Sequence, residues 1–329
     1  MNNITILSIL LLTGLASCHK FEDENQQYAQ SNYRRGPKEQ TIFQEALLFV
    51  SQFWDSHAAQ VICSFVLSVY AFNYFIGRRM NNTMAVTWLD SVRQVIADNF
   101  SVVGQITKVQ TPDQVEFEEN TSTEYSVLCT GRENFHYCLI RLTLRSRQEL
   151  MTMLATSLCK RYAKQRDCVW IEIPIERGDK AVHSEILIVD KRELKDINTN
   201  MPHIEKILYP IDTVATEKNL QVMGENVESV EAIMRDQRVS SFVRNFNDLI
   251  IAIHITDQRL YNKFDYVLKA QFRLAGRDDK SSERWNKLMK DVLYLADTLS
   301  KVKVSYKTQQ DTLERRKKLL NSGDQKKTK

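Results

Sequence analysis

The chain has 329 residues and a net charge of +4, with 43% hydrophobic and 26% charged side chains. This composition is typical of a globular protein and excludes a chain that is disordered throughout. Only 9 glycines and 5 prolines are present, and the sequence contains no glycine-rich phosphate-binding motif, no zinc-protease motif and no serine-hydrolase motif. The length predicts about two domains.

The positive charge is concentrated at one end of the sequence. Residues 301–329 contain ten Lys or Arg and three Asp or Glu, a net charge of +7, so the rest of the chain is slightly acidic. Such a basic segment either contacts a polyanion or serves as a solvated tail.

The first apolar segment predicts a cleaved signal peptide. Residues 4–15 are apolar and precede Ala16-Ser17-Cys18, small residues that suit a cleavage site. A stretch of this length is too short to span a bilayer. We therefore expect residues 1–18 to be removed, with a lipoprotein signal or a buried N-terminal helix as the alternatives.

A second apolar segment predicts a transmembrane helix over residues 58–77. Its twenty residues carry no charge, and at about 1.5 Å per residue they cover roughly 30 Å, the hydrocarbon thickness of a bilayer. The alternative is a buried core helix of a soluble domain. Before it, residues 42–54 show the apolar periodicity of an amphipathic helix.

The charges beside this segment predict its orientation. Arg78 and Arg79 follow it directly, whereas residues 19–55 hold four basic and six acidic side chains. Because positive charge favours the cytosolic side, we expect residues 19–57 to form a short luminal segment and residues 78–329 to be cytosolic. This is a type I single-pass topology with the bulk of the chain in the cytosol.

The pattern after the span predicts an α+β domain over residues 78–281 rather than a doubly wound fold. Helical spacing occurs at 83–99 and 147–159, and two further helices are expected within 225–248. Alternating strand patterns occur at 125–129 and 136–146, which flank a turn and predict a hairpin. The other expected strands are 169–176, 184–190, 248–255 and 266–274.

Residues 282–329 predict a long basic C-terminal helix and tail. From Trp285 to Leu320, apolar or seam positions recur at steps of three and four, a coiled-coil-like period over five heptads. The same period also suits a long helix that packs partly on the domain. Because Tyr306, Gln309 and Arg316 are poor seam residues, we expect the distal half to be an exposed helix.

Catalytic and metal-binding chemistry finds little support in the sequence. Cys129, His136 and Cys138 lie close together in the sequence, but a structural zinc site needs a fourth ligand and close ligand pairs. We therefore expect free thiols in a reducing compartment, no cofactor and no enzyme activity. Four glycosylation sequons, at Asn3, Asn81, Asn99 and Asn120, can report the topology.

Several segments, in order along the chain, resemble the calumin family, the coiled-coil-domain-containing PAT-complex subunits of the endoplasmic reticulum membrane. They are YAFNYFIGRRMN from Tyr70, AVTWLDSVRQVIADNFSVVG from Ala85, CTGR from Cys129, LIRLTLRSRQELMTML from Leu139, HITDQ from His254 and the basic segment near the C-terminus. Together they cover about residues 45–320. No single motif is highly specific, and the resemblance rests on the order in which the motifs occur along the chain.

The resemblance implies a signal-cleaved, single-span protein of the endoplasmic reticulum membrane whose C-terminal helices contact the ribosome. Such proteins are not enzymes. With a small membrane partner subunit of the PAT complex, and next to the Sec translocon, they shelter weakly hydrophobic spans of nascent multipass membrane proteins. Low-affinity calcium binding is also attributed to an acidic luminal region, but residues 19–57 hold only six acidic side chains.

The leading hypothesis is therefore a ribosome- and translocon-associated factor that assists insertion and folding of multipass membrane proteins. Ribosomal RNA would be contacted by six cations, and membrane lipid would surround the span. The alternative is a single-span membrane tether, or a calcium-homeostasis protein, without ribosome contact. The six proposed RNA contacts are Arg315, Arg316, Lys317, Lys318, Lys326 and Lys327.

Overall fold

The computed structural model describes residues 42–104, 106–107, 112, 115–158, 166–176, 184–213, 219–258, 264, 266–274 and 279–325. The predicted signal peptide, residues 19–41 of the predicted luminal segment, and Lys326 and Lys327 lie outside these residues. The chain divides into two units, residues 1–67 and residues 68–329. The first is described only through helix α2.

Helix α2, Ile42–Asn99, is one continuous helix of 58 residues. It merges the three helices that the sequence predicts at 42–54, 58–77 and 83–99. Proline is absent from this segment and Gly77 is its single glycine, so no residue strongly interrupts the backbone hydrogen bonds.

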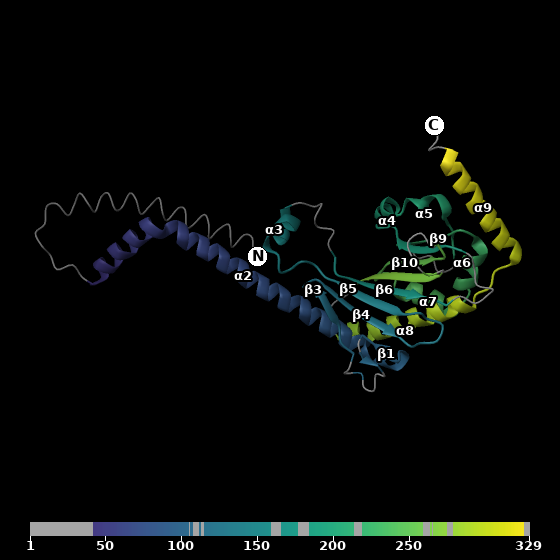
Figure 1. Cartoon of the computed structure of the whole chain (residues 1–329), viewed down its shortest axis with the longest axis horizontal. Helices are drawn as coiled ribbons and strands as arrows, with labels where there is room; N and C mark the ends of the chain where they lie inside the picture. Colours follow the sequence, from purple (N-terminus) through teal and green to yellow (C-terminus); the bar gives the residue numbers. More distant parts are fainter. Residues whose placement is uncertain are drawn as a thin grey trace, which may run out of the picture. The chain divides into compact units, whose positions relative to one another are not determined.

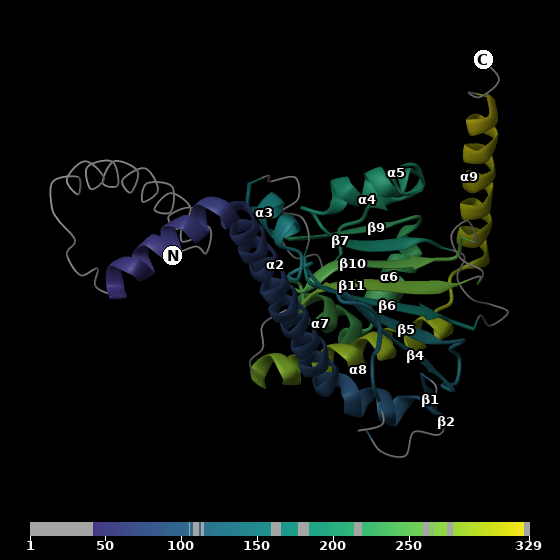
Figure 2. The ribbon, with the colours of Figure 1, turned by 60° about the vertical axis from the view of Figure 1, so that its left-hand side comes forward.

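The second unit is built on an antiparallel sheet of 11 strands (Figures 1 and 2). The strand order is β2-β1-β4-β5-β6-β11-β10-β7-β9-β8, and β3 pairs with β4. The strands are β1 Val102–Val103, β2 Ile106–Thr107, β3 Glu118–Thr121, β4 Glu124–Thr130, β5 Cys138–Thr143, β6 Cys168–Pro174, β7 Ile186–Asp190, β8 Tyr209–Pro210, β9 Leu220–Gly224, β10 Ile250–Thr256 and β11 Val267–Arg273. The sheet confirms the mixed α and β class and every strand that the sequence predicts.

Helices cover the two faces of the sheet unequally. The larger cluster of buried side chains joins the sheet to the C-terminal part of α2 and to α6, Val227–Met234, α7, Gln237–Asn245, and α8, Asp279–Lys301. A smaller cluster lies under α4, Leu194–Asn200, and α5, Pro202–Ile207. Because side chains alternate between the faces of a strand, Leu187 and Val189 join the smaller cluster while Ile186 and Ile188 join the larger one.

Aromatic packing holds the C-terminal part of α2 in the larger cluster. The Trp88 ring stacks on Phe117 with the ring centroids 5.9 Å apart, and it meets Trp285 of α8 edge-on at 5.6 Å. Leu89, Val92 and Ile96 are also buried, as the helical spacing predicts, and so is Val95. Val86, which the same spacing places among the apolar positions, is exposed.

The segment Cys129–Arg132 ties three elements together. Gly131 has a φ of +85°, a conformation that glycine adopts without steric cost. The turn directs Arg132 so that it donates a hydrogen bond to Asn99 at the end of α2 and another, 2.7 Å long, to Asp297 of α8. This segment therefore has a structural role, because it connects the end of β4 to α2 and α8.

Asn81 is part of the protein interior although it begins a glycosylation sequon. Its side-chain amide donates to the carbonyl oxygens of Ser122 and Arg145 at 3.0 and 3.1 Å, and its oxygen accepts from Arg147 at 3.0 Å. A buried amide with satisfied hydrogen bonds is a packing element. Of the sequons in the described residues, the one at Asn120 is exposed, on strand β3.

The prediction of one helix from 282 to about 320 is wrong. Helix α8 ends at Lys301, residues 302–305 are not helical, and α9 runs from Tyr306 to Gln325. The periodic apolar residues of α8 pack into the core, which confirms the alternative of a helix packed on the domain; they are Trp285, Leu288, Val292, Leu295 and Leu299.

The close approach at Gly77 generates a stability prediction. A Cβ atom at Gly77 would overlap the backbone carbon of Arg147 and the backbone nitrogen of Gln148. At an open helical position, replacement of glycine by alanine stabilises a helix by about 1 kcal/mol. Here we expect Gly77→Ala to destabilise the second unit by about 1–3 kcal/mol through overpacking, measured by denaturant unfolding in detergent. Val86→Ala, at an exposed position of the same helix, is the control, and a stabilised Gly77→Ala variant would contradict the contact.

Candidate functional site

The first candidate site is the basic helix α9, whose N-terminal end is fixed by one carboxylate of α6. Glu228 accepts hydrogen bonds from the backbone N–H and the hydroxyl of Ser305, both at 2.8 Å, and from the hydroxyl of Thr308. These hydrogen bonds lower the pKa of Glu228, led by that from Thr308. The break between α8 and α9 is therefore a defined corner.

Arg316 anchors the middle of α9 in an acidic pocket of the domain. Its Nε donates to Glu225 at 2.6 Å, and its two terminal nitrogens donate to the two oxygens of Asp257 at 2.9 and 2.8 Å. Both acidic side chains are 1% exposed, and the Arg316 side chain is 17% exposed. Although burial alone would lower it, the two carboxylates raise the pKa of Arg316. Buried charges are tolerated only when paired in this way.

The anchor continues into a polar network at the end of the sheet. The carboxylate of Glu225 accepts from the backbone N–H of Glu185 at 3.3 Å, and Glu185 in turn lies 2.7 Å from Nε2 of His254. Burial would raise the pKa of Glu185, but hydrogen bonds with His203 and His254 outweigh this and hold it at about 2. Arg316 is thus connected through Glu225 and Glu185 to His254 of β10 and His203 of α5.

The structure places four of the six predicted RNA contacts, and their environments differ. Arg316 is used inside the fold, and Arg315 lies 5.0 Å from the ring centroid of Tyr209 while donating to the carbonyl oxygen of Glu225. Lys317 and Lys318 are exposed. Lys326 and Lys327 lie outside the described residues.

Sequence spacing did not predict that Arg316 would be largely buried while Lys317 and Lys318 are exposed. The reason is that the acidic partners of Arg316, Glu225 and Asp257, are far from it in the sequence.

The second candidate site is an apolar surface on α2. Within this helix, one segment has the length and hydropathy of a membrane span, with a mean hydropathy of 1.6 over an 18-residue window that is 0% buried. In the first unit the exposed apolar side chains are Ile62, Phe65, Val66 and Leu67, and in the second they are Tyr70, Phe72, Phe75 and Ile76. The alternative of a buried core helix is therefore wrong for this segment.

Helix α3, Leu150–Leu158, begins beside the end of that apolar segment (Figures 1 and 2). The amide of Asn73 donates to the carbonyl oxygens of Arg147 and Gln148 at 3.4 and 3.2 Å, one turn before Gly77. Asn73, a polar residue within the predicted span, therefore binds the backbone that leads into α3. On α3 itself, Met151 is 71% exposed.

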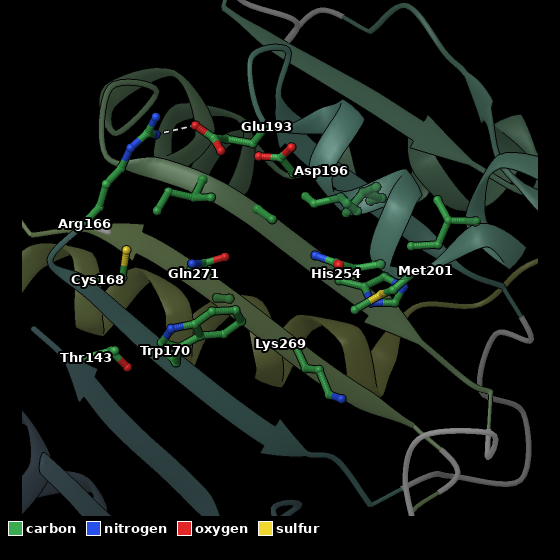
Figure 3. Close-up of a pocket in the computed structure, with 17 residues that line it drawn as sticks. Thr143, Arg166, Cys168, Trp170, Glu193, Asp196, Met201, His254, Lys269 and Gln271 are labelled. Carbon is green, nitrogen blue, oxygen red and sulfur yellow. Dashed lines mark hydrogen bonds and ion pairs between the residues drawn. The ribbon is translucent and has the colours of Figure 1, made fainter. Parts of the chain in front are cut away.

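A groove on the sheet face beside α4 and α5 is the third feature (Figure 3). It has a volume of about 390 Å³. Trp170 of β6 and Lys269 of β11 lie on its floor, Met201 lies on its wall, and the ion pair of Arg166 with Glu193 lies at one end. Sequence reasoning missed this groove because α4 and α5 are short and carry no clear periodicity.

The candidate zinc ligands have other roles in the structure. Cys129 and Cys138 face each other directly on β4 and β5, and burial raises the pKa of Cys129 to about 12 and that of Cys138 well above its usual value. The His136 ring stacks on Phe264 with the ring centroids 4.7 Å apart. Among the described residues, no group of three or more His, Cys, Asp and Glu side chains is placed to hold a metal ion.

Comparison with known proteins identifies the class of the chain. The family model described as PAT complex subunit CCDC47 matches residues 57–329. This match covers α2 from His57 onward and the whole second unit, including the antiparallel sheet and both C-terminal helices. The chain belongs to the family of PAT complex subunit CCDC47.

Curated relatives with that name are similar at modest identity. The protein from Danio rerio is 23% identical over 248 residues, which cover 72% of this chain and 48% of the relative. The Xenopus laevis protein is 25% identical over 212 residues, and the Homo sapiens protein is 22% identical over 217 residues; each match covers 62% of this chain and 42% of the relative. The chain therefore spans less than half the length of these relatives.

The Arg316 anchor predicts that neighbouring cations of α9 contribute very differently to the free energy of unfolding. Arg316→Ala leaves Glu225 and Asp257 buried without their partner, so we expect a loss of about 3–5 kcal/mol in the free energy of unfolding. Lys317→Ala, at the next and exposed position, should change it by less than about 0.5 kcal/mol. Denaturant unfolding of both variants measures the difference, and equal effects would contradict the anchor.

Proposed function

We propose that this chain is a non-catalytic subunit of a PAT-type complex in the endoplasmic reticulum membrane. In this role it assists insertion and folding of multipass membrane proteins beside the ribosome and the Sec translocon. Membership of the family supports this proposal. Its partners would be a small membrane subunit, nascent multipass proteins, ribosomal RNA and membrane lipid.

The proposed topology is a luminal segment over residues 19–57, a span over residues 58–77 and a cytosolic remainder. The exposed apolar side chains of α2 support the span, because transfer of each large apolar side chain from water to an apolar phase gains about 1.5–3 kcal/mol. Arg78 and Arg79 mark its cytosolic end, and both are exposed.

The observation that carries the ribosome contact is the division of charge on α9. Arg316 is held by the domain, while the next two residues, Lys317 and Lys318, are exposed. Because the helix is anchored, its exposed cations stay in a fixed place. A row of exposed cations binds RNA phosphates by charge, without recognising the base sequence. Arg315, Lys326 and Lys327 remain part of the proposed RNA surface, whereas we assign Arg316 a positioning role.

A membrane tether without ribosome contact is the second candidate. Tyr306 and Leu313 are seven residues apart on α9, and they are 75% and 40% exposed. Residues seven apart lie on the same face of a helix, so these two side chains offer one surface for a partner helix, although Tyr306 is a poor seam residue for a coiled coil. Cross-linking of the full chain through α9 into a dimer that is insensitive to salt would favour this candidate.

The RNA contact predicts a loss of ribosome binding on charge reversal. We expect the double variant Lys317→Glu, Lys318→Glu to lower co-sedimentation with ribosomes roughly tenfold at physiological salt, with a shallower salt dependence. The matched control is Lys287→Glu, Lys290→Glu, which makes the same change in net charge at exposed positions of α8. Equal binding by the two variants across a salt titration would contradict the RNA role of α9.

The topology predicts that Asn120 carries no glycan. Asn120 is exposed on β3, so its sequon would be modified if the domain were luminal. A positive control is Gln27→Thr, which completes a sequon at Asn25 in the proposed luminal segment. Expression in microsomes should add sugar to the control variant at Asn25 only, read as a mobility shift that a glycosidase removes. A glycan at Asn120 would reverse the proposed orientation.

A further inference from the structure

We propose that the groove beside α4 and α5 is a docking site for a short amphipathic helix of another protein, with an acidic side chain next to its apolar face. This helix would lie in the groove and continue over the part of the sheet face formed by β4, β5, β6 and β11. The site belongs to the second unit alone, so it depends on neither the proposed span nor the proposed ribosome contact.

Helices α4 and α5 cover only half of this face of the sheet. The smaller cluster joins them to β7, β9 and β10 through side chains such as Leu187, Met223 and Ile251. Beyond that cluster, Trp170 of β6 is 44% exposed and Leu128 of β4 is 46% exposed. Since sheet faces bury their apolar side chains against a second layer, the described part of the chain leaves the half formed by β4, β5, β6 and β11 without a helical layer.

The strand register joins the exposed side chains of this half into one surface. Leu139 lies opposite Leu128 on β4 and opposite Glu172 on β6. Glu172 in turn lies opposite Lys269 on β11, and Trp170 shares their face because it is two residues from Glu172. Three spacings of about 4.8 Å separate β4 from β11, roughly 14 Å in total. A helix of about ten residues covers this distance.

The hydrogen bonds of the sheet favour a helix over an extended peptide as the occupant. Strands β6, β11 and β10 each pair with a strand on both sides, so the groove floor offers no free strand edge. An extended peptide would leave its backbone N–H and C=O groups without sheet partners, whereas a helix satisfies its own. An amphipathic helix that places its apolar face in a groove is a recurring mode of recognition.

Trp170 and Met201 would supply the main apolar contacts to this helix. Trp170 lies on the floor of the groove and Met201 on its wall (Figure 3). Tryptophan and methionine are enriched at protein interfaces, and a partly exposed tryptophan is a frequent source of binding energy. The flexible methionine side chain adapts to the shape of an incoming apolar residue.

Most charged groups around the groove already have partners. Arg166 pairs with Glu193 at one end of the groove, and Nε2 of His254 lies 2.7 Å from Glu185. Asp196, on the wall, also interacts within the chain. These groups therefore offer no uncompensated charge to an incoming helix.

Lys269 supplies the charge that selects an acidic helix. Within the described ranges, no acidic side chain forms an ion pair with Lys269. Glu172, directly opposite, instead accepts a hydrogen bond from the hydroxyl of Tyr137 at 2.7 Å. A half-buried ammonium group is complemented by a carboxylate, which gives a charge-assisted hydrogen bond and fixes the orientation of a partner. The occupant therefore carries Asp or Glu beside the apolar residues that meet Trp170.

Site-specific photo-cross-linking of the full chain in intact microsomes tests the site. Asn200→p-benzoylphenylalanine places a photoreactive group in the groove, and Val227→p-benzoylphenylalanine, at a 44% exposed position of α6, is the control. Adducts are quantified, and the cross-linked peptides are sequenced by mass spectrometry. The groove measurement is repeated with Trp170→Ala, with Lys269→Gln and with Lys287→Gln, which removes the same charge at an exposed position of α8.

The proposal predicts an adduct at position 200, absent at 227, between this chain and another protein. The cross-linked peptide should have apolar residues at helical spacing beside Asp or Glu. Trp170→Ala should lower the adduct roughly tenfold, and Lys269→Gln several-fold, while Lys287→Gln leaves it unchanged. Glutamine at 269 avoids the repulsion from Glu172 that a glutamate would add, so this variant keeps the fold.

Several results would overturn the proposal. Adducts confined to this chain or to a second copy of it would show a different cover for the groove, and a lipid adduct would show a membrane contact there. The absence of any adduct at position 200 would show an unoccupied groove. A cross-linked peptide without acidic residues, or equal yields with Lys269→Gln and Lys287→Gln, would contradict the selection of an acidic helix.

Discussion

Large apolar side chains of α2 that the described part of the chain leaves exposed are costly in water, and this constraint governs the interpretation of α2. The helix buries Trp88, Leu89 and Val92 in the core near its C-terminal end. Earlier turns expose large apolar residues, including Phe65 and Phe72. The two regions overlap at Asn73–Asn81, where the helix makes amide hydrogen bonds and a close glycine contact while Phe75 and Ile76 remain exposed. The C-terminal part of α2 therefore packs against the sheet domain, while its earlier turns present an apolar surface.

Electrostatics organises the other end of the chain in a similar way. Helix α9 carries adjacent cations with different surroundings, because Arg316 enters a pocket formed by Glu225 and Asp257 while Lys317 and Lys318 face outward. A buried ion pair of this kind contributes orientation more than net stability, since desolvation offsets much of the attraction. The anchor fixes where the exposed charges lie relative to the sheet. A flexible basic tail of the same composition would not hold its charges in one position relative to the sheet.

The sequence predicts elements whose pattern is local and strong. Alternation identified β4, β5, β6, β7, β10 and β11, and helical spacing identified α3, α6, α7 and the buried face of α8. The short strands β1, β2, β3 and β8, the strand β9 and the helices α4 and α5 were missed, because two to seven residues show little periodicity. The heptad spacing continued through the corner at 302–305, where Glu228 binds Ser305 and Thr308. The role of Arg316 also depends on acidic residues distant in sequence, which spacing does not reveal.

The central claim is that the apolar segment of α2 is integral to a lipid bilayer. Alkaline carbonate extraction of microsomes containing the full chain tests it most directly, because high pH removes peripheral proteins and leaves integral ones in the membrane pellet. The account predicts that the chain stays in the pellet, together with a known integral marker. Release of the full chain into the supernatant, with the marker retained, would contradict it.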